Sequence, residues 1–200
     1  PYLLIADSLA VKEGETASPT IQPDYREIGR RLGEQLKTKK QKIGIIADWK
    51  MSEAVQAEIS GLTEALEGSG SEISWCIYRR KEQNITERMK EETKADALVI
   101  LDPGVLEEFG EQAEHGKYKG AELYGVGYSL KTVALLDKGN IQGLVVPDGY
   151  EIGYKSVKEI AEKIEHKFYK MKGYTTEYQI FSKKDFSMDD DLERFLYSYE

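Results

Sequence analysis

Polar and aromatic side chains stand at the ends of short apolar runs at several points of this chain. Six of them lie there and a seventh lies one turn into a predicted helix; the set is Asp7, Trp49, Asp102, Tyr128, Ser129, Asp148 and Glu58. Carboxylates and hydroxyls form directional hydrogen bonds, and aromatic rings stack on flat ligand faces. These residue types point to ligand binding, because open parallel sheets bind ligands beyond the carboxyl ends of their strands.

Each candidate also has a purely structural explanation, and the sequence leaves both open. Trp49, between Asp48 and Lys50, either stacks on a ligand or packs beneath its own loop. Asp102 either contacts a ligand or caps the helix that begins at Val105.

The other candidates divide in the same way. Tyr128 follows Gly127 at a predicted strand end and is expected to contact the ligand. Asp7 and Asp148 either contact a ligand or hold a hinge through hydrogen bonds. Glu58 is either a ligand contact or a solvated carboxylate on a helix.

Patterns typical of catalysis, metal binding and phosphate binding are absent from the sequence. There is no G-x-S-x-G or H-E-x-x-H motif, and the segment 47–52 lacks the glycines of a phosphate loop. His115 and His166 are expected at exposed helix ends, and the single cysteine, Cys76, in a buried strand. The sequence therefore predicts a protein that is not an enzyme and uses no metal or cofactor.

The composition is that of an ordinary folded, soluble domain. Of the 200 residues, 40% are apolar and 32% are charged. The formal net charge of −8 argues against nucleic-acid binding through this chain. No apolar run approaches the ~20 residues that are needed to cross a bilayer.

Apolar runs and amphipathic segments alternate along the chain. The runs predict strands at 2–6, 43–47, 73–78, 97–101, 123–126, 141–146 and 176–181, and 9–23 is expected to be a loop. The amphipathic segments predict helices at 24–36, 52–66, 85–93, 105–113, 130–138 and 150–171. Because the apolar runs are continuous rather than alternating, we expect an α/β fold with a parallel sheet flanked by helices on both faces.

The last third of the chain joins these elements in a characteristic order. One strand leads through Gly127-Tyr128-Ser129 into a short helix that ends at Gly139, and the next leads through Pro147-Asp148-Gly149 into a long helix. Together with the segments 2–7 and 22–29, this order resembles the periplasmic-binding-protein type I fold. Sugar-binding proteins of ABC transporters and lac-repressor-type effector domains share that fold.

The resemblance implies two lobes joined by hinges. It assigns 24–147 and 174–200 to a carboxy-terminal lobe, and 1–23 and 148–173 to remnants of an amino-terminal lobe. Hinge crossings are expected near 22–24, 147–149 and 172–175. Since the remnants alone would expose apolar faces to water, we expect the gene product to be longer or another chain to cover them.

The predicted cleft differs from that of sugar-binding members at four places. Where those members carry an arginine, Asn-Asp, an acid and a glutamine, this chain has Glu58, Pro103-Gly104 after Asp102, Ser129 and Pro147. The resemblance therefore predicts the fold and the place of a ligand, but not the identity of that ligand.

The function implied by the resemblance is capture of a small polar, sugar-like solute between two closing lobes. The solute would pass to an ABC permease from an extracellular protein that is lipid-anchored or periplasmic. The alternatives are the effector domain of a cytoplasmic transcriptional regulator, a sensing domain coupled to a kinase, or a degenerate lobe that binds other proteins.

Overall fold

A computed structural model of the chain describes residues 3–5, 18–48, 52–79, 84–118 and 120–184. The strands in these residues are β1 Leu4–Ile5, β2 Thr20–Pro23, β3 Lys42–Ala47, β4 Glu72–Tyr78, β5 Ala97–Ile100, β6 Glu122–Val126, β7 Gly143–Pro147, β8 Tyr174–Thr176 and β9 Tyr178–Ser182. The helices are α1 Tyr25–Leu36, α2 Glu53–Leu66, α3 Ile85–Met89, α4 Pro103–Glu114, α5 Leu130–Asp137 and α6 Gly149–Glu165.

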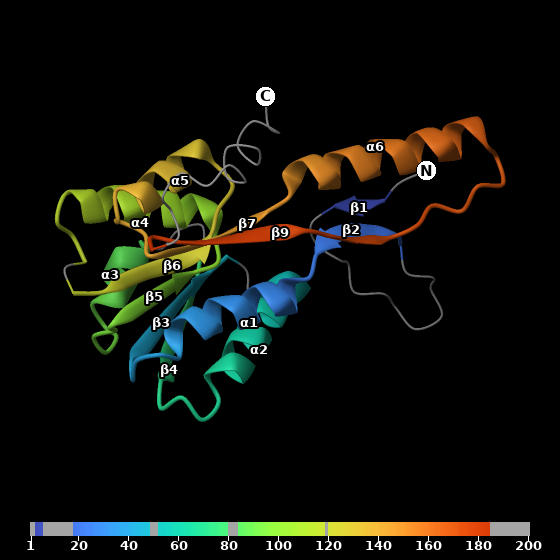
Figure 1. The fold of residues 1–200 in the computed structure, drawn as a ribbon. Helices are drawn as coiled ribbons and strands as arrows, with labels where there is room; N and C mark the ends of the chain where they lie inside the picture. Colours follow the sequence, from blue (N-terminus) through green and yellow to red (C-terminus); the bar gives the residue numbers. More distant parts are fainter. Residues whose placement is uncertain (1–2, 6–17, 49–51, 80–83, 119, 185–200) are drawn as a thin grey trace.

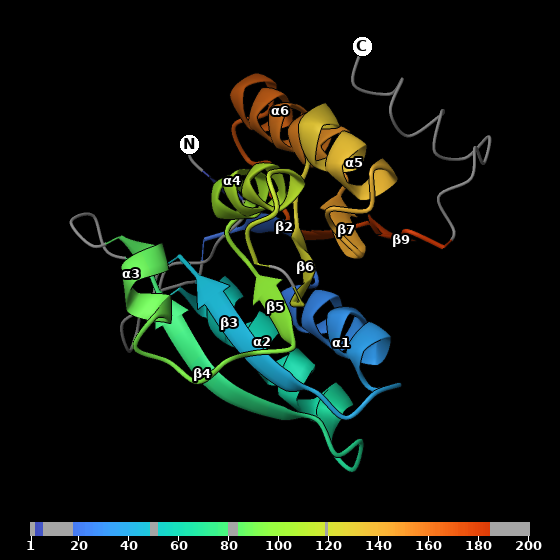
Figure 2. The same ribbon diagram turned by 90° about the vertical axis from the view of Figure 1, so that its left-hand side faces the viewer.

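The larger of two sheets has six strands in the order β4-β3-β5-β6-β7-β9. All neighbouring strands are parallel except β9, which runs antiparallel to β7. Helices α1 and α2 cover one face, and α3, α4 and α5 cover the other (Figures 1 and 2). This arrangement confirms the predicted α/β class, and we call it the large unit.

Two apolar clusters fill the space between this sheet and its helices. Ile43 and Ile45 of β3 point to the face with α1 and α2, whereas Ile46 points to the face with α4 and α5. All three side chains are fully buried. Burial on both faces explains why these strands read as continuous apolar runs in the sequence.

Two glycines allow α1 and α2 to pack very closely. A Cβ atom at Gly29 would lie 1.9 Å from the backbone oxygen of Glu58, and one at Gly61 would lie 1.9 Å from that of Arg26. A real side chain at either place would therefore force the helices apart. The contact fixes α2, and with it Glu58, against the start of α1.

The smaller sheet consists of β1, β2 and β8, all parallel, with α6 packed beside it (Figure 1). We call these four elements the small unit. A buried carboxylate stabilises the small unit through hydrogen bonds. Glu159 on α6 is 1% exposed and accepts hydrogen bonds from the Tyr169 hydroxyl at 2.9 Å, the Lys172 N–H at 2.7 Å and the Tyr174 hydroxyl at 2.8 Å.

Three segments differ from the sequence prediction. The expected loop 9–23 contains β2, whose short polar-apolar alternation around buried Ile21 is too brief to stand out. The expected helix 150–171 ends at Glu165, since the bonds from Glu159 to Lys172 and its neighbours turn the chain back. The expected strand 176–181 is two strands in different sheets, separated by Glu177.

Three connections join the two units, from β2 to α1, from β7 to α6 and from β8 to β9. The family resemblance assigns 174–200 to the carboxy-terminal lobe as one segment. In the structure β8 pairs with β2 in the small sheet, and the chain joins the large sheet only at β9. Hydrogen bonds link the β7–α6 connection to the β8–β9 connection. Asp148 N–H donates to the Glu177 carbonyl at 3.0 Å, and Glu177 N–H donates to the Glu151 carboxylate at 2.8 Å.

Candidate functional site

An ion pair lies at the carboxyl edge of the large sheet, just beyond β4 and β5. An Arg79 guanidinium nitrogen is 2.7 Å from one carboxylate oxygen of Asp102. The other oxygen of Asp102 accepts a hydrogen bond from Val105 N–H at 3.0 Å and so caps α4. The Asp102 side chain is 8% exposed and that of Arg79 is 52% exposed, so the pair presents its arginine to solvent.

The backbone of the neighbouring strands fixes this pair. Arg79 N–H donates to the Ala47 carbonyl at 2.8 Å, and Leu101 N–H donates to the Ile46 carbonyl at 2.8 Å. Both strand ends are therefore tied to the end of β3, whose next residue is Asp48. The pKa of Arg79 is raised by its hydrogen bond to Asp102 and by the charge of that carboxylate.

Tyr128 belongs to the same group of side chains. It lies beyond β6 with 61% of its surface exposed, which gives it room to meet a ligand. Its pKa is raised first by partial burial of the hydroxyl and then by the negative charge of Asp102. Because β4, β5 and β6 are parallel strands of one sheet, the residues that follow them, Arg79, Asp102 and Tyr128, all lie at its carboxyl edge. We call these three residues the Arg79 group.

Ser129 has a structural role at the start of α5. Its hydroxyl accepts from Thr132 N–H at 3.1 Å and donates to the Glu107 carboxylate at 2.7 Å. That hydrogen bond, followed by the ion pair to Lys131, lowers the pKa of Glu107. Ser129 thus links α4 to α5 behind the Tyr128 loop.

The other predicted residues lie apart from this group or cannot be placed. Asp148 caps α6 by accepting from Glu151 N–H at 2.8 Å, at one of the connections between units. Glu58 is 3% exposed on α2, where its backbone lies against Gly29 of α1, so the alternative of a solvated carboxylate is wrong. Asp7 and Trp49 lie outside the described residues.

Arg79 was missed in the sequence. The available signal was its position directly after the apolar run 73–78, which is the same signal that selected Asp102 and Tyr128.

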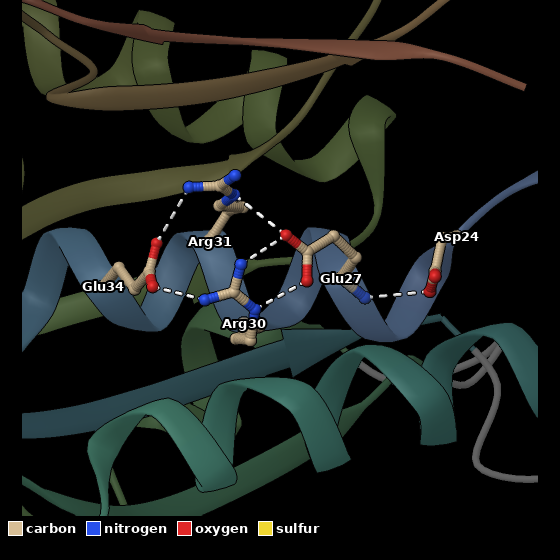
Figure 3. Close-up of polar contacts among 5 residues, drawn as sticks. All are labelled: Asp24, Glu27, Arg30, Arg31 and Glu34. Carbon is tan, nitrogen blue, oxygen red and sulfur yellow. Dashed lines mark hydrogen bonds and ion pairs between the residues drawn. The ribbon is translucent and has the colours of Figure 1, made fainter.

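The arginines of α1 are engaged elsewhere and do not contribute to this edge. Arg30 and Arg31 each bond to both Glu27 and Glu34, in a network along the outer side of the helix, while Asp24 caps its first turn (Figure 3). The bond to Arg30 lowers the pKa of Glu27, although partial burial opposes this. These ion pairs between residues three and four positions apart therefore stabilise α1 itself.

The chemistry that the Arg79 group offers is hydrogen bonding. A guanidinium has five N–H donors, a carboxylate accepts, and a phenol does both, which together suit a ligand rich in hydroxyls. Among the described residues, no cluster of His, Cys, Asp or Glu could hold a metal ion. No described helix combines the length and the apolar character that would let it cross a membrane.

Comparisons with known proteins establish the architecture. No protein-family model matches the sequence, and no curated protein matches it either. Solved structures do. GanP, a glucose-galactose binding protein from Geobacillus stearothermophilus, is 20% identical with a TM-score of 0.75, and the match covers 94% of this chain and 69% of that one.

Two further solved structures carry different ligands and partners. The myo-inositol binding protein of Caulobacter is 16% identical with a TM-score of 0.77, and the match covers 95% of this chain and 67% of that one. The complex of the TorS sensor domain with TorT gives 16% identity, a TM-score of 0.70 and coverage of 95% and 67%. The chain thus spans about two thirds of these proteins. The likeness shows that it has the periplasmic-binding-protein type I fold.

Proposed function

We propose that this chain binds a small polar solute, rich in hydroxyl groups, at the carboxyl edge of the large sheet. The observation that supports this most strongly is the Arg79–Asp102 pair, which lies at the same carboxyl edge of parallel strands as Tyr128. Asp102 is buried and fixed by Val105, whereas Arg79 is half exposed. Within the described part of the chain, the bond to Asp102 uses one guanidinium donor of Arg79, so the other donors can meet ligand hydroxyls without reorganisation of the site.

In this proposal the large and small units are two lobes that close on the solute. The amino-terminal-lobe elements are 1–23 and 148–173, extended to Thr176 by β8, and the rest forms the carboxy-terminal lobe. The three connections act as hinges, and a solute that contacts both lobes stabilises the closed form. Asp148, at a hinge, is then a hydrogen-bonding hinge residue as well as a candidate ligand contact.

The setting that we propose is transport. A protein of this fold on the outer side of the membrane, lipid-anchored or periplasmic, would pass its solute to an ABC permease. The solute-binding proteins among the similar structures support this setting, since one is a glucose-galactose binding protein and another a myo-inositol binding protein. No catalytic role is included in the proposal.

A sensing role is the second candidate. The similarity to the TorS–TorT complex supports it, because there a protein of this fold is bound to a sensor domain. In that case a kinase-linked sensor, rather than a permease, would read the closed form. An effector domain of a transcriptional regulator would use the same closure, and a degenerate lobe would bind protein without any solute.

Thermal-shift measurements with pentoses, hexoses and inositols test the proposal. We expect at least one of them to raise the melting temperature, because a solute that binds only the folded state stabilises it. Arg79→Ala should weaken the affinity for that solute about tenfold or more, as expected for loss of charged hydrogen bonds. Asp102→Asn should act in the same direction.

The matched control is Arg26→Ala. Arg26 is also exposed and also forms one ion pair, with Glu64 at 2.9 Å, but that pair lies between α1 and α2. This variant should bind the solute as the wild type does. If no compound of these classes stabilises the chain, the solute-binding proposal fails and the degenerate-lobe alternative gains support.

A further inference from the structure

A second cavity lies at the opposite edge of the large sheet from the Arg79 group. Its volume is about 400 Å³, within the range of ~300–1,000 Å³ that is typical of small-molecule pockets. Its lining comes from the end of α1, the loop before β3, the starts of β6 and β7, and the end of β9. These are the amino ends of the parallel strands, so the cavity is separate from the proposed solute site.

One side chain in the wall of this cavity has unsatisfied hydrogen-bonding groups. Both the oxygen and the nitrogen of the Gln35 carboxamide are buried, and neither has a hydrogen-bond partner among the residues that the structure describes. Buried polar groups in folded proteins nearly always form hydrogen bonds, so an unpaired buried amide points to a partner such as a bound ligand. Gln35 lies against Gly143, where a Cβ atom would be 2.1 Å from its oxygen, and the absence of a side chain there makes room for the amide.

The other polar groups of the wall are already ordered. The Glu122 carboxylate accepts from Lys39 Nζ at 2.7 Å, Gln41 Nε2 at 3.2 Å and the Tyr124 hydroxyl at 3.0 Å. Burial raises the pKa of Glu122, but these donors outweigh burial and lower it overall. The Glu122 carboxylate and the Tyr124 ring are therefore already fixed in the cavity wall that also holds the unpaired Gln35 amide. Binding a ligand would not have to order these two side chains.

The charge of the lining favours an anion. Three lysines and one glutamate line the cavity, which is an excess of two positive charges in a chain with a net charge of −8. Lys39 is paired with Glu122, and Lys183 lies 3.6 Å from an Asp137 carboxylate oxygen. Lys184 is exposed at the rim of the cavity, where its positive charge can attract a negatively charged group.

We propose that this cavity is a second binding site, for a small hydroxy acid such as a sugar acid. The ligand carboxylate lies at the lysine rim, near Lys184. Its hydroxyls enter the cavity, where one accepts from the Gln35 amide nitrogen and one donates to the Gln35 amide oxygen. Because a glutamine side chain rotates about three bonds, the amide can turn from its buried position toward the ligand.

The test is an NMR titration of the isotopically labelled chain with D-galacturonate, with D-galactose and acetate as comparison probes. Galacturonate should shift the Gln35 side-chain amide and the Leu123 backbone amide, which donates to Gln142 at the cavity wall, in a saturable way. Galactose should bind at least tenfold more weakly, and acetate alone should cause no saturable shift. Shifts confined to Arg79 and Tyr128 would overturn this proposal while supporting solute binding at the other edge.

Three variants separate the two sites. Gln35→Leu removes the unpaired amide without changing the size of the side chain much, and it should weaken galacturonate binding at least tenfold while leaving the melting temperature unreduced. Lys184→Ala, at an exposed position, should lower the affinity for galacturonate to that for galactose. Asp102→Asn should leave galacturonate binding at this cavity unchanged. Unaltered binding in both Gln35→Leu and Lys184→Ala would contradict the proposal.

Discussion

The large unit covers its sheet with helices on both faces, whereas the small unit has one described helix, α6, with an apolar outer side. That side carries large exposed side chains in helical spacing and just beyond the helix end: Tyr150, Tyr154, Val157, Ile164 and Phe168. Val157 is 70% exposed, whereas every residue of β5 and β7 in the large sheet is buried. Exposed apolar surface of this kind costs about 25 cal/mol per Å² relative to burial.

The two units are therefore held together by different means. Apolar packing and close helix contact through Gly29 and Gly61 stabilise the large unit. In the small unit, the carboxylate of Glu159 ties α6 to Tyr169, Lys172 and β8 through hydrogen bonds. From this difference we expect the large unit to be the more stable of the two, and the exposed apolar side of α6 to be available for contact with further polypeptide.

The largest expected effect comes from adding a methyl group between α1 and α2. Gly61→Ala places a Cβ atom 1.9 Å from the Arg26 carbonyl oxygen, and we expect it to lower the free energy of unfolding by about 3 kcal/mol. Gly153→Ala on α6 is the control, because a Cβ atom there would have no described atom within 4 Å. It should raise stability by up to about 1 kcal/mol through helix propensity. Urea unfolding measures both, and equal effects would contradict the contrast between the units.

Removal of the buried carboxylate should have the next largest effect. Glu159→Ala leaves three donors without their acceptor and should cost about 2 kcal/mol in the small unit. Burial raises the pKa of Glu159, but the bonds from Lys172, Tyr174 and Tyr169 outweigh it and hold the pKa below its ordinary value of 4.5.

The lowered pKa of Glu159 has a definite consequence for acid stability. A depressed pKa contributes stability that is present above the unfolded value and is lost as the pH falls through the folded value. The wild type should therefore lose part of its stability below about pH 4.5, whereas Glu159→Ala should lose less over the same range. Parallel curves for the two proteins, from unfolding experiments at pH 3 to 7, would show that Glu159 is not the anchor.

The smallest effect is expected on the outer side of α6. Val157→Thr should change the free energy of unfolding by no more than about 0.5 kcal/mol, because the side chain is already exposed. Val99→Thr, its counterpart in fully buried β5, should cost about 2 kcal/mol, since a hydroxyl is buried there. Denaturant titrations of the two variants compare the units directly; similar losses would mean that α6 is covered in the isolated chain.

The sequence was sufficient for features that depend on neighbouring residues. Continuous apolar runs predicted β3, β5, β6 and β7, and the helix that follows Asp102 made capping one of the two roles expected of that residue. Strand ends of a parallel sheet meet at one edge, so Asp102 and Tyr128 could be placed near each other from the predicted order alone.

Other features depend on contacts between distant residues and could not be foreseen. Arg79 meets Asp102 across 23 positions of sequence, and Glu159 meets Tyr174 across 15. Glu58 is buried at a point where α1 and α2 pack closely through Gly29, and the spacing of residues within one helix does not reveal such a contact. A strand as short as β2 has too few residues for its alternation to be recognised.

Native-state hydrogen exchange, resolved by residue, tests most directly whether one unit is self-sufficient and the other is not. Amides of β3 and β5 should exchange only through global unfolding, because their strands lie inside the six-stranded sheet. Amides of β2 and β8 should exchange through local opening, at a clearly lower free energy. The same exchange free energy in both sheets would contradict the account, since it would show one cooperative unit that needs no further cover.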